Sequence, residues 1–132
     1  QRQMCIRDRI NWEPDVPAFM ERLTEYAYGA VKGHEGHVCY INFVMNVTPD
    51  CDCAGWSDMP MIPDVGILAS LDPVALDQTC FDLVQKQPLL TNMDLQGRDL
   101  FTARWPHTHG HIQLDYAEEL GMGTKDYELK IL

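Results

Sequence analysis

The chain has 132 residues, of which 45% are hydrophobic and 23% are charged, a balance typical of a globular domain and not of a disordered tail. Its apolar stretches are shorter than the roughly 20 residues that a membrane-spanning helix needs. The formal net charge of −10 disfavours contact with nucleic-acid phosphates and anionic lipids. We therefore expect one domain, or part of one, with neither nucleic acid nor membrane as a partner.

The N-terminal segment differs in origin from the rest of the sequence by our interpretation. Residues 2–9 match one reading frame of AGACAGATGTGTATAAGAGACAG, the transposase end sequence used to build sequencing libraries. We predict that residues 1–9 are an adapter-derived artefact and that the natural N-terminus lies upstream, which leaves a signal peptide open. A genuine basic segment is the alternative. The cysteines are odd in number and unevenly spaced, which favours a reducing, cytoplasmic compartment over a disulfide scaffold.

Residues 17–32 have the pattern of an amphipathic helix. Asp15 is placed to cap its N-terminus, and Gly33 follows at the position where a left-handed residue often ends a helix. We expect its apolar side to face the core. That side consists of Phe19, Leu23, Tyr26, Ala27, Ala30 and Val31.

Residues 38–47 form an almost unbroken apolar run that predicts a strand covered on both faces. Asn42 and Asn46 share one face and need hydrogen-bond partners there if they are buried. The other face is wholly apolar, with Cys39, Ile41, Phe43, Met45 and Val47. A long loop over residues 48–64 then leads to a short apolar strand at 65–69.

After the second strand, Asp72 and Pro73 are suited to the N-cap and first turn of a helix. Residues 88–106 are expected to hold loops and a short helix, residues 110–120 a last helix, and residues 127–132 an edge strand. This succession predicts an α/β domain with a mixed or mostly parallel sheet flanked by helices.

The strand ends give one candidate site. If the two strands are parallel, the 49–58 loop and the 70–72 turn meet at the same edge of the sheet, where ligands gather in such folds. The polar residues of a small-ligand or enzymatic site would then be Asn46, Ser70, Asp72 and Asp77. Asp72 is equally well explained as a helix cap, and the cysteines are incidental under this hypothesis.

Cys51 and Cys53 give the other candidate site. Two thiols one residue apart are suited to a soft metal or part of a cluster, and Asp58 and Asp64 are nearby acidic ligands. The pair is at most half of a site, since zinc and iron–sulfur centres take four ligands. A redox pair and ordinary loop cysteines are the alternatives. Neighbouring aspartates raise the pKa of a thiol, so a nucleophilic cysteine is disfavoured.

Three histidines at alternate positions, His107, His109 and His111, are a weaker metal candidate. Pro106 precedes them and Gly110 separates the last two, which favours an exposed turn into the last helix instead.

Two longer motifs resemble a known family. The run INFVMNVTPDCDC covers residues 41–53, and DMPMIPDVGILASLDPVALDQ covers residues 58–78. Together with EYAYG upstream and QLDYAEELGMG downstream, they resemble domain of unknown function 362, whose members are described as uncharacterised iron–sulfur centre proteins. The resemblance extends over nearly all of the chain after Ile10.

The resemblance implies a protein two to three times longer, in which a ferredoxin-type insert with Cys-x-x-Cys-x-x-Cys spacing precedes this region. Residues 10–132 would then be the C-terminal part of a single, incomplete α/β domain. Its partner would be the missing N-terminal portion, and a 4Fe–4S iron–sulfur cluster would be bound mainly by the missing module. The family has no established substrate, so catalytic residues are unknown.

Three functional hypotheses follow from these observations. The first is redox or metal handling through the Cys51/Cys53 loop. The second is a small-ligand-binding or enzymatic domain with its site at the strand ends. The third is a structural half-domain without a site of its own.

Overall fold

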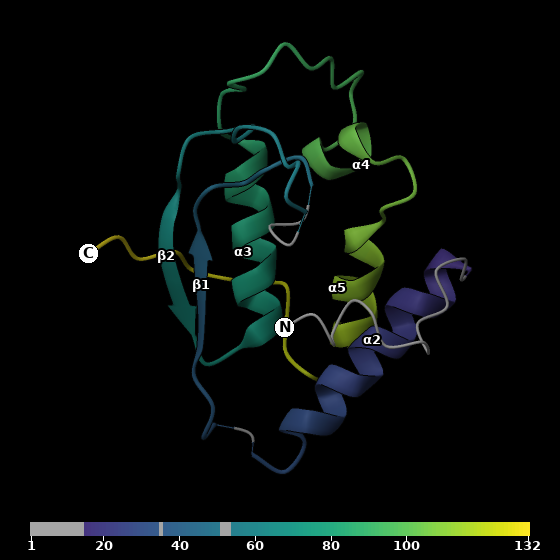
Figure 1. Cartoon of the computed structure of the whole chain (residues 1–132). Coiled ribbons are helices and arrows are strands. Elements are labelled where there is room, and N and C mark those ends of the chain that lie inside the picture. The colour runs from purple at the N-terminus through teal and green to yellow at the C-terminus, as the bar shows by residue number, and fades with distance from the viewer. Residues whose placement is uncertain (1–14, 35, 51–53) are drawn as a thin grey trace.

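The computed structural model describes residues 15–34, 36–50 and 54–132. The predicted artefact at residues 1–9 and the thiol pair Cys51 and Cys53 therefore lie outside the described residues. Figure 1 shows three layers: the sheet, helix α3 beside it, and then helix α5 with helix α2. The elements in chain order are α2 (Val16–Val31), β1 (Tyr40–Val44), β2 (Gly66–Ser70), α3 (Pro73–Gln85), α4 (Leu100–Arg104) and α5 (Gly110–Glu119).

The α/β content is confirmed, but the predicted mixed or mostly parallel sheet is wrong for the described strands. β1 and β2 pair antiparallel, with Tyr40 opposite Ser70 and Val44 opposite Gly66. A continuous apolar run predicts a strand without giving its direction. The connection between the strands is long enough for either direction, so the sequence pattern alone does not decide between them.

Two clusters of buried side chains form the core. One lies between the sheet, the loop that follows β1, and the C-terminal half of α3; the other joins the start of α3 to α5. The first contains Val44, Met61, Ile62, Val84 and Leu100, and the second contains Val74, Leu114 and Ala117. Helix α3 thus contributes to both clusters and connects the sheet to the helical layer.

The sheet is covered on one face only by the described residues. Val44 and Leu68 pack in the first core cluster, on the side of α3. On the opposite face the side chains of Ile41, Phe43 and Ile67 are 56%, 67% and 63% exposed. The prediction that the first strand is covered on both faces is therefore wrong in the part of the chain that the structure describes.

Helix α2 has nearly the predicted bounds but not the predicted burial. Gly33 has the expected left-handed conformation, with φ of +85°, while Asp15 makes no side-chain capping bond. Leu23 and Tyr26 are 46% and 83% exposed, and Thr24 is the helix's buried residue. One face of α2 contacts α5, where the Tyr116 hydroxyl donates to Glu25 Oε1 over 3.1 Å.

Candidate functional site

Hydrogen bonds between residues close to the ends of the two strands hold the base of the loop between β1 and β2. The backbone N–H of Asn46 donates to Asp64 Oδ1 over 2.8 Å, and that of Val65 donates to the Val44 carbonyl over 2.9 Å. The Met61 N–H donates to the Val47 carbonyl over 2.8 Å. Asn46 has a positive φ of 50°, a conformation that asparagine tolerates better than most residues. These contacts close the loop just beyond the sheet.

The segment immediately before Cys51 is fixed from within the loop and from α4. The Thr48 and Ser57 hydroxyls both donate to the Asp50 carbonyl, over 2.8 and 3.2 Å. Trp105 Nε1 donates to the Pro49 carbonyl over 2.9 Å. The Arg104 guanidinium lies 3.4 Å from both carboxylate oxygens of Asp50. We call this set of contacts the Asp50 clamp.

Helix α4 supplies the outer half of the Asp50 clamp. Asp99 caps its N-terminus by accepting from the Thr102 N–H over 2.9 Å. Partial burial raises the pKa of Asp99, but hydrogen bonds, chiefly those from Thr102, outweigh it and hold the pKa below its ordinary value. At the other end of the helix, Arg104 stacks 4.3 Å from the Trp105 ring. The guanidinium is thus oriented by the indole beside it.

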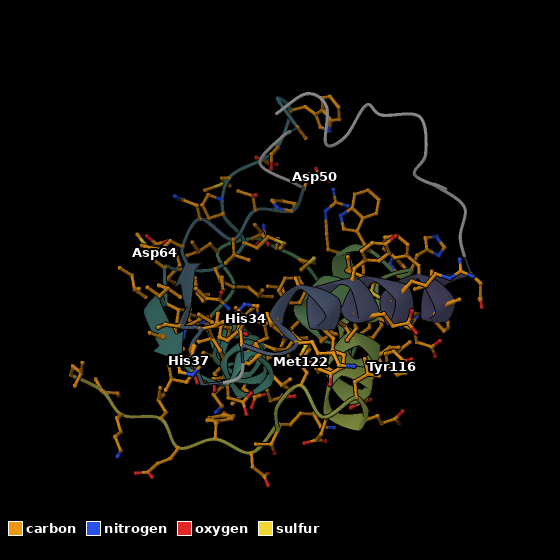
Figure 2. All side chains as sticks on the ribbon, turned by 90° about the horizontal axis from the view of Figure 1, so that it is seen from below. His34, His37, Asp50, Asp64, Tyr116 and Met122 are labelled. Carbon is orange, nitrogen blue, oxygen red and sulfur yellow. The ribbon has the colours of Figure 1, made fainter. Side chains whose placement is uncertain are left out.

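Asp58 and Asp64, the predicted acidic ligands, are exposed, and each accepts a backbone hydrogen bond. Asp58 Oδ1 accepts from the Met59 N–H over 2.8 Å, and Asp64 accepts from Asn46. Figure 2 shows Asp64 beside the strands and apart from Asp50. Across residues 15–34, 36–50 and 54–132, no three His, Cys, Asp or Glu side chains converge as a metal site.

The histidines lie in two separate places, the start of α5 and the turn after α2. His109 and His111 place their rings edge to face, 5.9 Å apart, while His107 is exposed. His34 and His37 lie on the exposed turn after α2 and, in Figure 2, away from Asp50.

The antiparallel pairing separates the polar residues predicted at the strand ends. Asn46 follows β1 at the end of the sheet where β2 begins, whereas Ser70 is the last residue of β2, at the opposite end, and Asp72 follows it. The expectation that the 49–58 loop and the 70–72 turn share one edge is therefore wrong. Asn46 and Asp72 belong to different regions of the molecule.

Asp72 is a structural anchor in every contact that it makes here. Its Oδ1 accepts from the N–H groups of Val74 and Ala75, over 2.9 and 3.0 Å, as predicted for an N-cap. Its Oδ2 accepts from the Thr124 N–H over 2.9 Å. A Cβ at Gly123 would collide with this carboxylate. Asp72 thus joins the start of α3 to the segment after α5.

Asp77 is linked to the sheet through Asn42. Asn42 Nδ2 donates to Asp77 Oδ1 over 2.7 Å and lies 3.4 Å from the Cys80 sulfur. Burial raises the pKa of the Cys80 thiol, and the Asp77 charge adds to this, while the bond from Asn42 lowers it. The partner that Asn42 was expected to need is thus supplied by α3.

Asp77 also lines a cavity of about 390 Å³ between α2, α3 and α5. Most of its lining is apolar, including Leu23, Val74 and Met122, and Thr24 and Gln113 are polar lining residues besides Asp77.

Sequence reasoning missed Arg104 and Trp105. The prediction placed a short helix somewhere between residues 88 and 106, but nothing in that segment indicates its partner. Asp50 lies 54 residues away from Arg104 in the sequence. An Arg–Trp pair at the end of a short helix indicates a contact only once it is known which loop packs against that helix.

Comparison with known proteins gives one positive finding. The profile of domain of unknown function 362 (DUF362) matches residues 3–82, more than half of the chain. No curated protein and no solved structure gives a significant match. None of the described helices has the length and hydropathy to cross a membrane. By the extent of the profile match, the chain belongs to the DUF362 family.

Proposed function

We propose that this protein is an iron–sulfur-associated protein that handles a metal or electrons through the Cys51/Cys53 loop. The observation that carries the proposal is the Asp50 clamp, which fixes the backbone directly before Cys51 by contacts from two parts of the chain. A solvated loop without a binding role gains nothing in function from being ordered in this way. A metal-binding loop benefits from it, because ordering the ligands beforehand reduces the entropy lost on binding.

The charges around the clamp also support a thiolate pair. The Asp50 carboxylate is 19% exposed and is partly balanced by Arg104, 3.4 Å away. This one of the acidic charges beside the pair is therefore less unfavourable for a neighbouring thiolate than the sequence alone suggested. Thiolate sulfur is the ligand type that iron–sulfur centres and other soft metals prefer.

Two thiols are half of a ligand set, so the remaining donors belong to the proposal as well. We assign them to the ferredoxin-like module that the family resemblance implies upstream of this region. In this arrangement Cys51 and Cys53 meet a metal or cluster at the surface between the two parts. When bound, an iron–sulfur cluster supplies one-electron transfer. Residues 48–57 would present the sulfur atoms to it.

Cobalt(II) titration of the full chain under anaerobic conditions tests the thiol pair directly. We expect sulfur-to-cobalt charge-transfer absorption in the wild type and its loss in the Cys51→Ser/Cys53→Ser double variant. Cys39→Ser is the matched control, because Cys39 is an exposed cysteine outside the loop. Equal absorption in the wild type and the double variant would remove the loop from the proposed site.

Small-ligand binding is the second candidate function, and the 390 Å³ cavity favours it. Asp77 and Gln113 would orient a ligand among apolar side chains. A small ligand bound there should raise the melting temperature with or without iron, and Gln113→Leu should abolish the rise. A rise that Gln113→Leu leaves unchanged would place the ligand elsewhere.

A further inference from the structure

A groove with a volume of about 750 Å³ runs along the outer edge of β2. Its walls are β2, the side of α3 that carries Leu76 and Leu83, and the C-terminal tail, residues 127–132. Within the described part of the chain, β2 pairs with β1 alone. One row of β2 backbone groups therefore faces this groove without a neighbouring strand.

The tail starts at a fixed point beside the end of β2. Thr124 N–H donates to Asp72 Oδ2 over 2.9 Å, and Asp72 lies just after the last residue of β2. Lys125 holds the same segment to α5, with Nζ 2.6 Å from Asp115 Oδ1. A chain leaving this point along the outer edge of β2 runs antiparallel to it.

The tail sequence has the alternation of a half-buried strand. Tyr127, Leu129 and Ile131 alternate with Glu128 and Lys130. The Tyr127 hydroxyl donates to Asp82 Oδ2 on α3 over 2.8 Å. Because side chains of a strand alternate between its faces, an extended tail that keeps this contact directs Leu129 and Ile131 toward α3 as well. Glu128 and Lys130 then face solvent.

In the structure the tail lies in no regular element, and its apolar side chains are exposed. Leu129 is 45% exposed and Ile131 is 90% exposed. Figure 1 shows the C-terminus passing beyond β2 and away from the body of the molecule. An extended tail of six residues spans roughly 20 Å, enough to follow the five residues of β2.

We propose that residues 127–132 are a strap that closes on β2 as the third strand of the sheet. Closure pairs the outer edge of β2 and moves Leu129 and Ile131 into the groove. A three-stranded sheet packed on a helix is also more stable than a two-stranded one. The strap is independent of the thiol loop, which lies beyond the other end of β2.

Hydrogen exchange measured by NMR on the full chain tests the strap. We expect alternate tail amides, and the outer-edge amides of β2, to exchange at least about tenfold more slowly than unprotected amides. Leu129→Asp should abolish this protection, because it places a charge in the groove. Glu128→Gln is the matched control and should leave the protection intact.

Two further measurements distinguish strap closure from global stability and from association between chains. Deleting residues 128–132 should expose the outer-edge amides of β2 while leaving those paired with β1 protected. Protection should also be unchanged on dilution, since the strap belongs to the same chain. Tail amides exchanging at the unprotected rate in the wild type would overturn the proposal, as would protection that disappears on dilution.

Discussion

The two ends of the sheet carry similar sequence signals but have different roles. Each strand is followed by a turn with aspartate and proline, and both turns were candidate sites. At the end of β2, Asp72 is occupied by hydrogen bonds that cap α3 and hold Thr124. Beyond the end of β1, Arg104 contacts the Asp50 carboxylate and Trp105 donates to the Pro49 carbonyl, so this turn is fixed from outside the loop. A turn whose position is fixed by residues from another part of the chain is a better site candidate than a turn whose carboxylate is used to cap a helix.

Replacing Asp72 should have the largest effect on stability. Asp72→Ala removes the cap of α3 and the bond to Thr124, so we expect a loss of about 2 kcal/mol in the free energy of unfolding. Asp72→Asn keeps a capping oxygen but replaces one acceptor, so its loss should be smaller. Urea denaturation measures both. Cobalt binding should be unchanged in both variants. If cobalt binding fell together with stability, the end of β2 would also contribute to the metal site, which would contradict the different roles of the two ends.

Replacing Arg104 should lower metal affinity and leave the free energy of unfolding nearly unchanged, the opposite of replacing Asp72. Arg104→Ala releases Asp50, and we expect metal affinity at the thiol loop to fall about tenfold, as for other residues that orient ligands. Stability should change by less than about 1 kcal/mol, because the ion pair is partly exposed. Arg98→Ala is the control, since Arg98 is exposed and contacts Gln96. Equal cobalt affinity in the Arg104 and Arg98 variants would exclude a role for the clamp.

The cap of α4 should give a smaller, pH-dependent effect. The pKa of Asp99 is below its ordinary value of 3.8, so the stability that its charge contributes is present above that value and is lost as the pH falls through the lowered pKa. Asp99→Asn keeps an acceptor without titrating. We expect the wild type to be more stable by about 0.3–1 kcal/mol at pH 6. A difference that stays constant under acid would contradict this assignment.

The smallest effect that we expect is on the reactivity of the Cys80 thiol, which is partly buried. Its raised pKa leaves little thiolate at neutral pH. Iodoacetamide should therefore label Cys80 more slowly than the exposed Cys39, with mass spectrometry as the readout. Asp77→Asn removes a nearby negative charge and should speed the labelling of Cys80. An unchanged or slower rate in that variant would show that the Asp77 charge does not control the thiol.

Local structure was largely predictable from the sequence. The bounds of α2 and α5 and the start of α3 follow from apolar spacing and from local signals at Asp72 and Gly33, which act within a few residues. Long-range features were not. An apolar run does not encode strand direction, and the exposed face of Phe43 has the same sequence pattern as a covered one. The contact between Asp50 and Arg104 depends on how the 48–64 loop meets α4, which no local pattern specifies.

We propose that Cys51 and Cys53 bind metal on a loop that the contact between Asp50 and Arg104 holds in place. X-ray absorption at the iron edge, on the chain loaded anaerobically with iron, reports the atoms bound to the metal and so tests this proposal. We expect sulfur neighbours around iron in the wild type, replaced by oxygen or nitrogen in the Cys51→Ser/Cys53→Ser variant. The same iron environment in both proteins would show that the two thiols do not bind the metal.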